Sequence, residues 1–311
     1  MTDIDLNWFA NTKHHIQNTS INRISVKYKK AKNILECCCG NDNNESVGKS
    51  FPLKYERGFY ANNETQLDGL TNELKNIFFQ INDVLPTGGA ATGGVRRGNE
   101  VDYELKQLIN NKIIKDRLWQ YNEYTIKILK EMKMRNIRPF WAQVPVGDLE
   151  LKLATNLDML CVDEKGKIIN IQIKTTGLDT NYTKTTGKML SIIQRSPIIQ
   201  GIDDSLQMRH IVQATVEHYL AQTHFDNLLD RTEVWTIFSN LERPLVLNIS
   251  DHISHIQTTE ILNELLNRHT KSNLEIDILA LKKKHAIRCI RKKLIAKKRK
   301  KRQSTIFTYT K

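Results

Sequence analysis

The sequence lacks a regular cysteine pattern and any long apolar run. Its five cysteines are odd in number, three are consecutive at Cys37–Cys39, and no CxxC spacing occurs. Neither a disulfide scaffold nor a structural zinc site is expected, which favours a reducing compartment. No run of about 18 apolar residues is present, and Asp3, Asp5 and Lys13 stand where a signal peptide would be apolar. We therefore expect an intracellular protein that does not bind membranes.

Acidic residues are also missing from one segment near the end of the sequence. The chain of 311 residues has a formal net charge of +13, and Leu281–Arg302 contains thirteen Lys or Arg and no Asp or Glu. The remainder is therefore close to neutral. This segment is the element expected to bind a polyanion.

Composition changes divide the chain into four parts. Residues 1 to about 60 are polar and Asn-rich, which predicts loops or partial order, and Thr65–Ile81 has helical spacing. The glycine-rich Pro86–Gly94 predicts a flexible connection. We expect an α-rich, partly disordered N-terminal extension at 1–94, a core at 95–250, a helical continuation at 251–280 and a basic tail at 281–311.

From Gly98 the apolar periodicity predicts helices that alternate with strands, which indicates an α/β core with a mixed sheet flanked by helices. A tight turn at Glu164–Lys167 predicts a hairpin between two of these strands. The expected helices are Val101–Ile109, Tyr121–Arg135, Leu206–His224 and Thr258–His269, and the expected strands are Phe140–Val146, Leu153–Asp163, Lys167–Thr175, Thr232–Phe238 and Leu245–Ile249.

The predicted hairpin, ATNLDMLCVDEKGKIINIQIKTT, carries the polar residues that need explaining. Gln172 and Lys174 share one face of their strand, because side chains two apart point the same way, and a buried ammonium is costly without a partner. Asp158, across the hairpin, could meet both Lys174 and a divalent cation. Phosphodiester hydrolysis uses such a set: Asp158, the Gln172 amide and the Ile173 carbonyl as oxygen ligands of Mg²⁺, and Lys174 to hold the attacking water.

This hairpin resembles that of the PD-(D/E)xK nucleases, in which an Asp begins one strand and Asp/Glu-x-Lys ends the next. The flanking elements resemble the RecB-type branch, and the resemblance covers about Gly98–Leu220. It implies a restriction-endonuclease-like core and a Mg²⁺-dependent deoxyribonuclease, with Mn²⁺ as a substitute ion. The residues imply neither an endonucleolytic nor an exonucleolytic polarity, and no pathway.

The resemblance also implies roles for residues outside the hairpin. Asp102 takes the place of a helical metal ligand, with Glu123 as the competing choice. Gln213, in HIVQATVEHYL, would lie near DNA or the catalytic lysine, with Gln207 as its rival. Asp148 and Glu150 are interpreted as loop residues.

Two departures from the family pattern stand out. Gln172 replaces the usual Asp or Glu, which removes one negative charge from the metal site and should weaken Mg²⁺ binding. Gln-x-Lys nevertheless occurs in active members. The usual Pro before Asp158 is absent, at a position that varies in the superfamily.

The basic segment has two compatible uses. Ile287, Ile290, Leu294 and Ile295 interleave with basic residues at helical spacing, which predicts an amphipathic helix that binds DNA phosphates. Lys297–Arg302 resembles a nuclear localisation signal read by import receptors, which would make the protein nuclear in a eukaryotic cell. The residues expected to contact DNA here are Arg291, Lys292, Lys293, Lys297, Lys298, Arg299, Lys300, Lys301 and Arg302.

Three other interpretations of the sequence lead to different functions. NNESVGKS at Asn43–Ser50 ends like a phosphate-binding loop, but Asn43 stands where Gly is needed and no apolar strand precedes it. A catalytically inactive nucleic-acid-binding protein could retain the nuclease fold, with Gln172 as the sign of decay. A basic nuclear adaptor would bind acidic partners or RNA through its tail alone.

Overall fold

The structure is a computed structural model that describes residues 4–19, 26–37, 45–48, 51–56, 58–62, 65–78, 89–176, 202 and 205–267. The chain divides into two compact units, Met1–Leu262 and Asn263–Lys311. Of the second unit only residues 263–267 are described, and they are helical. The features below belong to the first unit.

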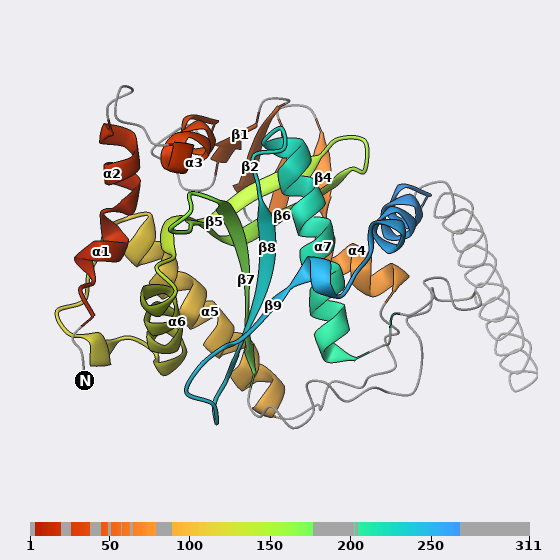
Figure 1. Cartoon of the computed structure of the whole chain (residues 1–311). Coiled ribbons are helices and arrows are strands. Elements are labelled where there is room, and N and C mark those ends of the chain that lie inside the picture. Colours follow the sequence, from red (N-terminus) through yellow and green to blue (C-terminus); the bar gives the residue numbers. More distant parts are fainter. Residues whose placement is uncertain are drawn as a thin grey trace, which may run out of the picture. The chain divides into compact units, whose positions relative to one another are not determined.

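Nine strands form one open sheet in the part of the chain that is described (Figure 1). The central strand β6 (Leu153–Val162) pairs antiparallel with β5 (Arg138–Asp148) and with β7 (Ile168–Thr176). β7 pairs parallel with β8 (Arg231–Phe238), and β8 pairs antiparallel with β9 (Leu245–Asn248). The predicted α/β class with a mixed sheet is confirmed, and the five strands lie within two residues of their predicted bounds.

Helices cover both faces of this sheet (Figure 1). The isoleucines at 169, 171 and 173 of β7 belong to one buried cluster with side chains of α5 (Gly89–Ile109) and α6 (Glu123–Met134). Lys174, which follows Ile173 and therefore points to the opposite face, reaches α7 (Leu206–His224). The alternation along β7 thus separates an apolar face from a face that carries polar side chains.

Local hydrogen bonds explain where two of these helices begin. The Asn122 side chain accepts from the backbone N–H of Tyr124 and caps α6, and Ser205 caps α7 by accepting from Met208. In the β6–β7 turn, Oδ1 of Asp163 accepts from the backbone N–H groups of two turn residues, and Gly166 has φ of 77°. The predicted tight turn at Glu164–Lys167 is confirmed.

The described parts of residues 4–62 contain helices, as expected of an α-rich extension, but they also contain strands where loops or partial order are predicted. Three helices lie here, α1 (Asn7–Ala10), α2 (Thr12–Asn18) and α3 (Val26–Cys37). Three short strands follow, β1 (Glu45–Val47), β2 (Pro52–Glu56) and β3 (Phe59–Ala61). Several apolar side chains of this region are buried: Phe9, Ile16, Ile34 and Leu53 are fully inaccessible to solvent. Tertiary packing therefore orders segments whose periodicity is weak.

Two further boundaries differ from those expected. The predicted helix at Thr65–Ile81 divides into strand β4 (Gln66–Gly69) and helix α4 (Leu70–Ile77). β4 pairs antiparallel with β3 and parallel with β6, so the N-terminal strands extend the sheet. The expected connection at Pro86–Gly94 is helical from Gly89 onward, where it forms the first turns of α5.

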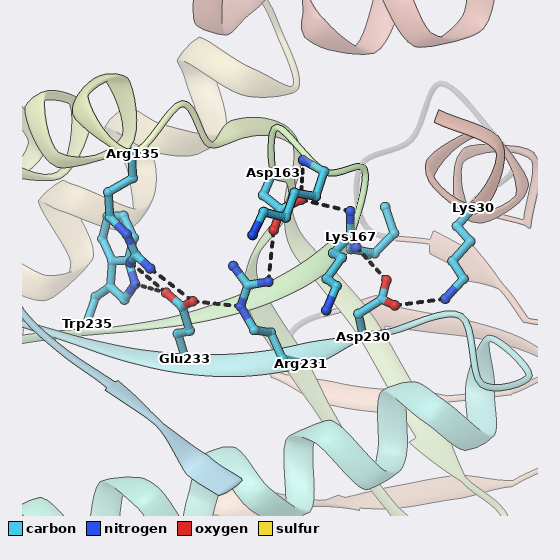
Figure 2. A network of polar contacts seen from close by, with 10 residues as sticks. Lys30, Arg135, Asp163, Lys167, Asp230, Arg231, Glu233 and Trp235 are labelled. Atoms are coloured by element: carbon cyan, nitrogen blue, oxygen red, sulfur yellow. Dashed lines mark hydrogen bonds and ion pairs between the residues drawn. The ribbon is translucent and has the colours of Figure 1, made fainter. Parts of the chain in front are cut away.

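A network of ion pairs joins the β6–β7 turn, α6 and β8 (Figure 2). The buried carboxylate of Glu233 accepts from Arg135, Arg231 and the indole N–H of Trp235. Arg231 also donates to Asp163 over 2.9 Å. These contacts hold the start of β8 against the turn that precedes β7.

Candidate active site

Along one edge of β6 the partner strand changes from β4 to β7. On this edge Leu153 and Ala154 pair with β4 and Met159–Val162 pair with β7, while β5 occupies the other edge. Among the described residues, Thr155–Asp158 therefore have no strand partner on this edge. Asp158 is the last residue of the resulting gap in the sheet.

The Asp158 carboxylate accepts two hydrogen bonds at the gap. Its Oδ2 accepts from the backbone N–H of Ile173 over 2.7 Å, and the Gln143 side chain donates a second hydrogen bond. Asp158 therefore links β6 to β7 through its side chain just beyond Met159, where the regular ladder ends. The predicted approach of Asp158 to the end of β7 is present.

Gln143 has an unusual backbone conformation for a strand residue. Its neighbours Ala142 and Val144 pair with Met159 and Leu157, which places Gln143 opposite Asp158. Its φ of 56° lies in the left-handed region, which costs about 1–3 kcal/mol for a residue other than glycine. Such a conformation persists where the surroundings hold it in place, and here it accompanies the contact with Asp158.

Gln172 and Lys174 lie on β7 as predicted, but their side chains have different surroundings. Nζ of Lys174 donates to Oε1 of Gln213 on α7 over 3.3 Å. Gln172 is only 2% exposed, and its Oε1 has no hydrogen-bond partner among the described residues. A buried acceptor left in this state costs about 1–3 kcal/mol. A bound ligand could therefore supply the interaction that the Gln172 amide oxygen lacks.

Helix α7 supplies a carboxylate that the sequence interpretation missed. Nε2 of Gln213 donates to Oε1 of Glu217 over 2.8 Å, while the other carboxylate oxygen of Glu217 is buried without a partner in the described region. Glu217 itself is 0% exposed. Its position four residues after Gln213 places both side chains on one helix face, and this spacing was the available signal.

Asp102 on α5 interacts electrostatically with both Asp158 and Lys174. Glu123, its rival as the helical ligand, is exposed at the first residue of α6 and lines a different cavity together with Lys127 and Arg243. The structure therefore brings Asp102, and not Glu123, to the other candidate residues.

Burial governs the charges at this site. It raises the pKa of Asp102 to about 7 and the pKa of Glu217 to about 8, in both cases with a further rise from Asp158 and a partial offset from Lys174. Burial also raises the pKa of Asp158, against the opposing effects of Lys174 and of the Ile173 and Gln143 hydrogen bonds. Three carboxyl groups thus share one ammonium, an arrangement that would favour a bound cation.

Tyr60 on β3 lies at the gap in the sheet. The backbone of Asn156, within the gap, hydrogen bonds to the Tyr60 hydroxyl. Burial raises the pKa of Tyr60, and Tyr55, Glu217 and Asp158 raise it further. No sequence pattern pointed to this residue, because its strand was expected to be a loop.

The oxygen atoms of this cluster fit a hard divalent cation better than a soft one. No group of three or more His, Cys, Asp or Glu side chains in the described ranges forms a metal site by itself. The available donors are the Asp158 carboxylate, the Glu217 carboxylate and the Gln172 amide, and the last two each have an orphaned buried oxygen. Mg²⁺ prefers oxygen ligands and retains several waters, so a small set of protein oxygens suffices.

The other predicted residues lie apart from the cluster or outside the described residues. Gln207 is in the first turn of α7, and Gln213 is the one that contacts Lys174. Asp148 ends β5 and accepts from the Leu151 backbone, and Glu150 is exposed in the turn that follows. The predicted DNA-binding residues 291–302 lie outside the described residues.

Within the described residues, none of the helices is both long and apolar enough to cross a membrane. Comparison with known proteins finds no family model that matches the chain and no curated protein with significant similarity to it. The candidate site therefore rests on its own geometry.

Proposed function

We propose that the chain is a metal-dependent nuclease with a restriction-endonuclease-like core that hydrolyses phosphodiester bonds in DNA. The observation that carries this proposal is the cluster of buried and half-buried carboxyl groups around Lys174 at the gap in the sheet. Asp102, Asp158 and Glu217 come from three different elements and all interact with this one ammonium.

The order of elements supports the same proposal. A helix that carries Asp102 precedes three antiparallel strands, and the Gln213 helix and a parallel strand follow. This is the order implied by the resemblance to PD-(D/E)xK nucleases. A polar cluster at a strand gap within this order favours catalysis over a purely structural hairpin.

Each residue of the cluster has a separate role in the proposed reaction. Asp158, Glu217 and the Gln172 amide would hold Mg²⁺, with Asp102 as an additional acid and the Ile173 carbonyl as a further oxygen. The bound ion supplies Lewis-acid polarisation of the phosphoryl group. Lys174 orients the attacking water and offsets negative charge that develops on the phosphate. Gln213 positions Lys174 through its side-chain oxygen.

Glu217 can supply the negative charge that the proposed metal site lacks because Gln172 is neutral. The family pattern implied by the resemblance places a carboxylate at the position of Gln172, where this chain has a neutral amide. Glu217 lies across from Lys174 on α7, and its carboxylate is linked to Lys174 through the single side chain of Gln213. In this proposal Glu217, ionised when a cation is bound, restores the charge that Gln172 removes.

Gln172 also favours a second candidate function, a nucleic-acid-binding protein that retains the fold without cleavage. In that case the cluster would bind no catalytic ion, and Lys174 would serve only to compensate buried acids. The two candidates differ in whether any DNA is cut.

The deciding experiment incubates the purified full-length protein with linear, circular and single-stranded DNA in Mg²⁺, Mn²⁺ or EDTA. We expect cleavage with either ion, none with EDTA, and a loss of at least about 10²-fold in Lys174→Ala and Asp158→Ala. Lys167→Ala and Glu164→Ala, exposed positions in the turn of the same hairpin, are matched controls and should retain activity. DNA binding without cleavage by the wild-type protein would favour the second candidate.

A further inference from the structure

A cavity of about 180 Å³, lined by residues that carry polar groups, opens beside the carboxylate cluster. Four elements line it: β2 contributes Tyr55, α5 contributes Tyr103 and Lys106, β5 contributes Gln143, and β6 contributes Asn156. Asp102 lines the same cavity, one helical turn before Lys106. Tyr55 of β2 therefore lines one side of a cavity whose other sides include residues of the candidate active site.

The size of the cavity limits what it can hold. Pockets for drug-sized ligands occupy roughly 300–1,000 Å³, so this one is suited to a single base with part of its sugar-phosphate unit. A base pair could not enter. An occupant drawn from a nucleic acid would therefore have its base unpaired.

The lining residues match the chemistry of a nucleotide. Tyr55 offers a ring that is already held against Tyr60, with ring centroids 4.6 Å apart, and aromatic rings are platforms for base stacking. Lys106 supplies a positive charge for a phosphate. The amides of Gln143 and Asn156 can pair with the edge of a base, and the Asn156 Oδ1 is buried without a hydrogen-bond partner in the described part of the chain.

The cavity and the catalytic cluster are joined by shared residues. Gln143 lines the cavity and also donates a hydrogen bond to Asp158. Asn156 lines it too, and the backbone of Asn156 binds Tyr60 at the gap. A base seated in the cavity would thus place its adjacent phosphate close to Asp158 and Lys174.

We propose that this cavity is a nucleotide subsite that selects an unpaired base next to the phosphate to be cleaved, so that single-stranded DNA or an unpaired end is the preferred substrate. The subsite rests on the proposed nuclease function for its role, but its binding chemistry can be measured without cleavage. Tyr55 is the specificity-determining residue, because its ring provides the stacking surface.

The test compares the wild-type protein with Tyr55→Ala and Tyr55→Phe in two assays. The first measures binding in EDTA of a single-stranded oligonucleotide that carries 2-aminopurine, whose fluorescence is quenched when the base stacks. The second measures cleavage of single-stranded and blunt double-stranded DNA with Mg²⁺. Phe59→Ala, an exposed aromatic on the neighbouring strand that does not line the cavity, is the matched control.

We expect Tyr55→Ala to lose the quenching and to raise KM for single-stranded DNA by about 5- to 150-fold, the range that corresponds to the stacking of one base. Tyr55→Phe and Phe59→Ala should behave as the wild type does. Lys106→Gln, which leaves the rings in place, should weaken binding and keep the quenching of the bound fraction. Equal quenching in Tyr55→Ala and wild type, or equal KM values on both DNA forms, would overturn the subsite.

The two proposals fail in different ways. If the wild type cleaves DNA but Tyr55→Ala retains wild-type KM on single strands, the subsite is wrong and the nuclease assignment stands. If the wild type quenches the probe through Tyr55 but cuts no DNA, the subsite is supported as a binding site and the nuclease assignment is wrong.

Discussion

Lys174 on β7 donates a hydrogen bond from Nζ to Oε1 of Gln213 on α7, over 3.3 Å. This contact crosses from the sheet to the helix that covers it. It fixes the direction of an ammonium whose flexible side chain would otherwise sample several rotamers. The role of Gln213 in the proposed reaction is therefore one of positioning.

Replacement of this glutamine should affect turnover more than substrate binding. We expect Gln213→Ala to lower kcat about 10- to 100-fold with KM nearly unchanged, the range seen when a residue that orients a ligand is removed. Gln207→Ala, in the first turn of the same helix, should leave both constants unchanged. Steady-state kinetics on one DNA substrate separates the two constants. Equal effects of the two substitutions, or a change in KM alone, would contradict the positioning role.

The next prediction concerns the distribution of carboxylates between β7 and α7. Glu217→Gln should raise the Mg²⁺ concentration needed for half-maximal activity, because it removes the buried carboxylate that replaces the missing charge. Gln172→Glu should lower that concentration, and the double variant should return toward the wild-type value. Titration of activity against Mg²⁺ measures all three. If Gln172→Glu leaves the metal dependence unchanged, Gln172 faces away from the ion.

Much of the core was predictable because its apolar periodicity is strong. The β6–β7 hairpin combines continuous apolar strands with a Gly-containing turn, and α7 has its N-cap serine directly before Leu206. The positions of Asp158, Gln172 and Lys174 on the hairpin, and of Gln213 on the helix that follows, could therefore be predicted from the sequence.

The remainder of the site depends on contacts distant in sequence. Tyr60 reaches the gap only because β3 and β4 extend the sheet beside β6, and their apolar residues are too few to predict strands. Gln143 reaches Asp158 through a left-handed backbone within a strand, a conformation that no local pattern indicates. Glu217 lies in the predicted helix Leu206–His224, but its burial, on which its proposed role depends, could not be predicted from the sequence.

A buried histidine outside the site predicts a pH dependence of stability. Burial lowers the pKa of His224 to about 4, against an opposing effect of the Gly147 backbone. Its Nε2 lies 3.1 Å from the Ser46 hydroxyl, and its ring packs edge-on against Phe51 and Phe225.

Since the pKa of His224 is lower in the folded state than the ordinary value of about 6.5, the unfolded chain binds the proton more readily between pH 6.5 and 4. The stabilisation by neutral His224 is complete above pH 6.5 and is lost as the pH falls toward 4, by on the order of 3 kcal/mol. Urea unfolding at a series of pH values measures it. His224→Gln should flatten this part of the curve relative to the wild type, whereas His252→Gln should not. Parallel curves for His224→Gln and wild type would show that His224 does not carry the dependence.

The last prediction concerns the basic segment that lies outside the described residues. Substitution of all six residues of Lys297–Arg302 by Gln keeps the chain length and removes six positive charges. Each phosphate contact that is lost should reduce the slope of log K against log salt by about 0.9 on duplex DNA, because fewer condensed counterions are released. If all six touch phosphates, the slope should flatten by about five units, and binding should weaken most at low salt.

Cleavage should persist at high protein concentration, since Asp158, Glu217 and Lys174 are unchanged. A fluorescent fusion of the same variant should leave the nucleus of a eukaryotic cell if import receptors read this segment. Substitution of Lys112, Lys165 and Lys167, exposed lysines of the core, by Gln is the control for a general loss of charge. An unaltered salt slope in the six-residue variant would place the main DNA-binding surface elsewhere on the chain.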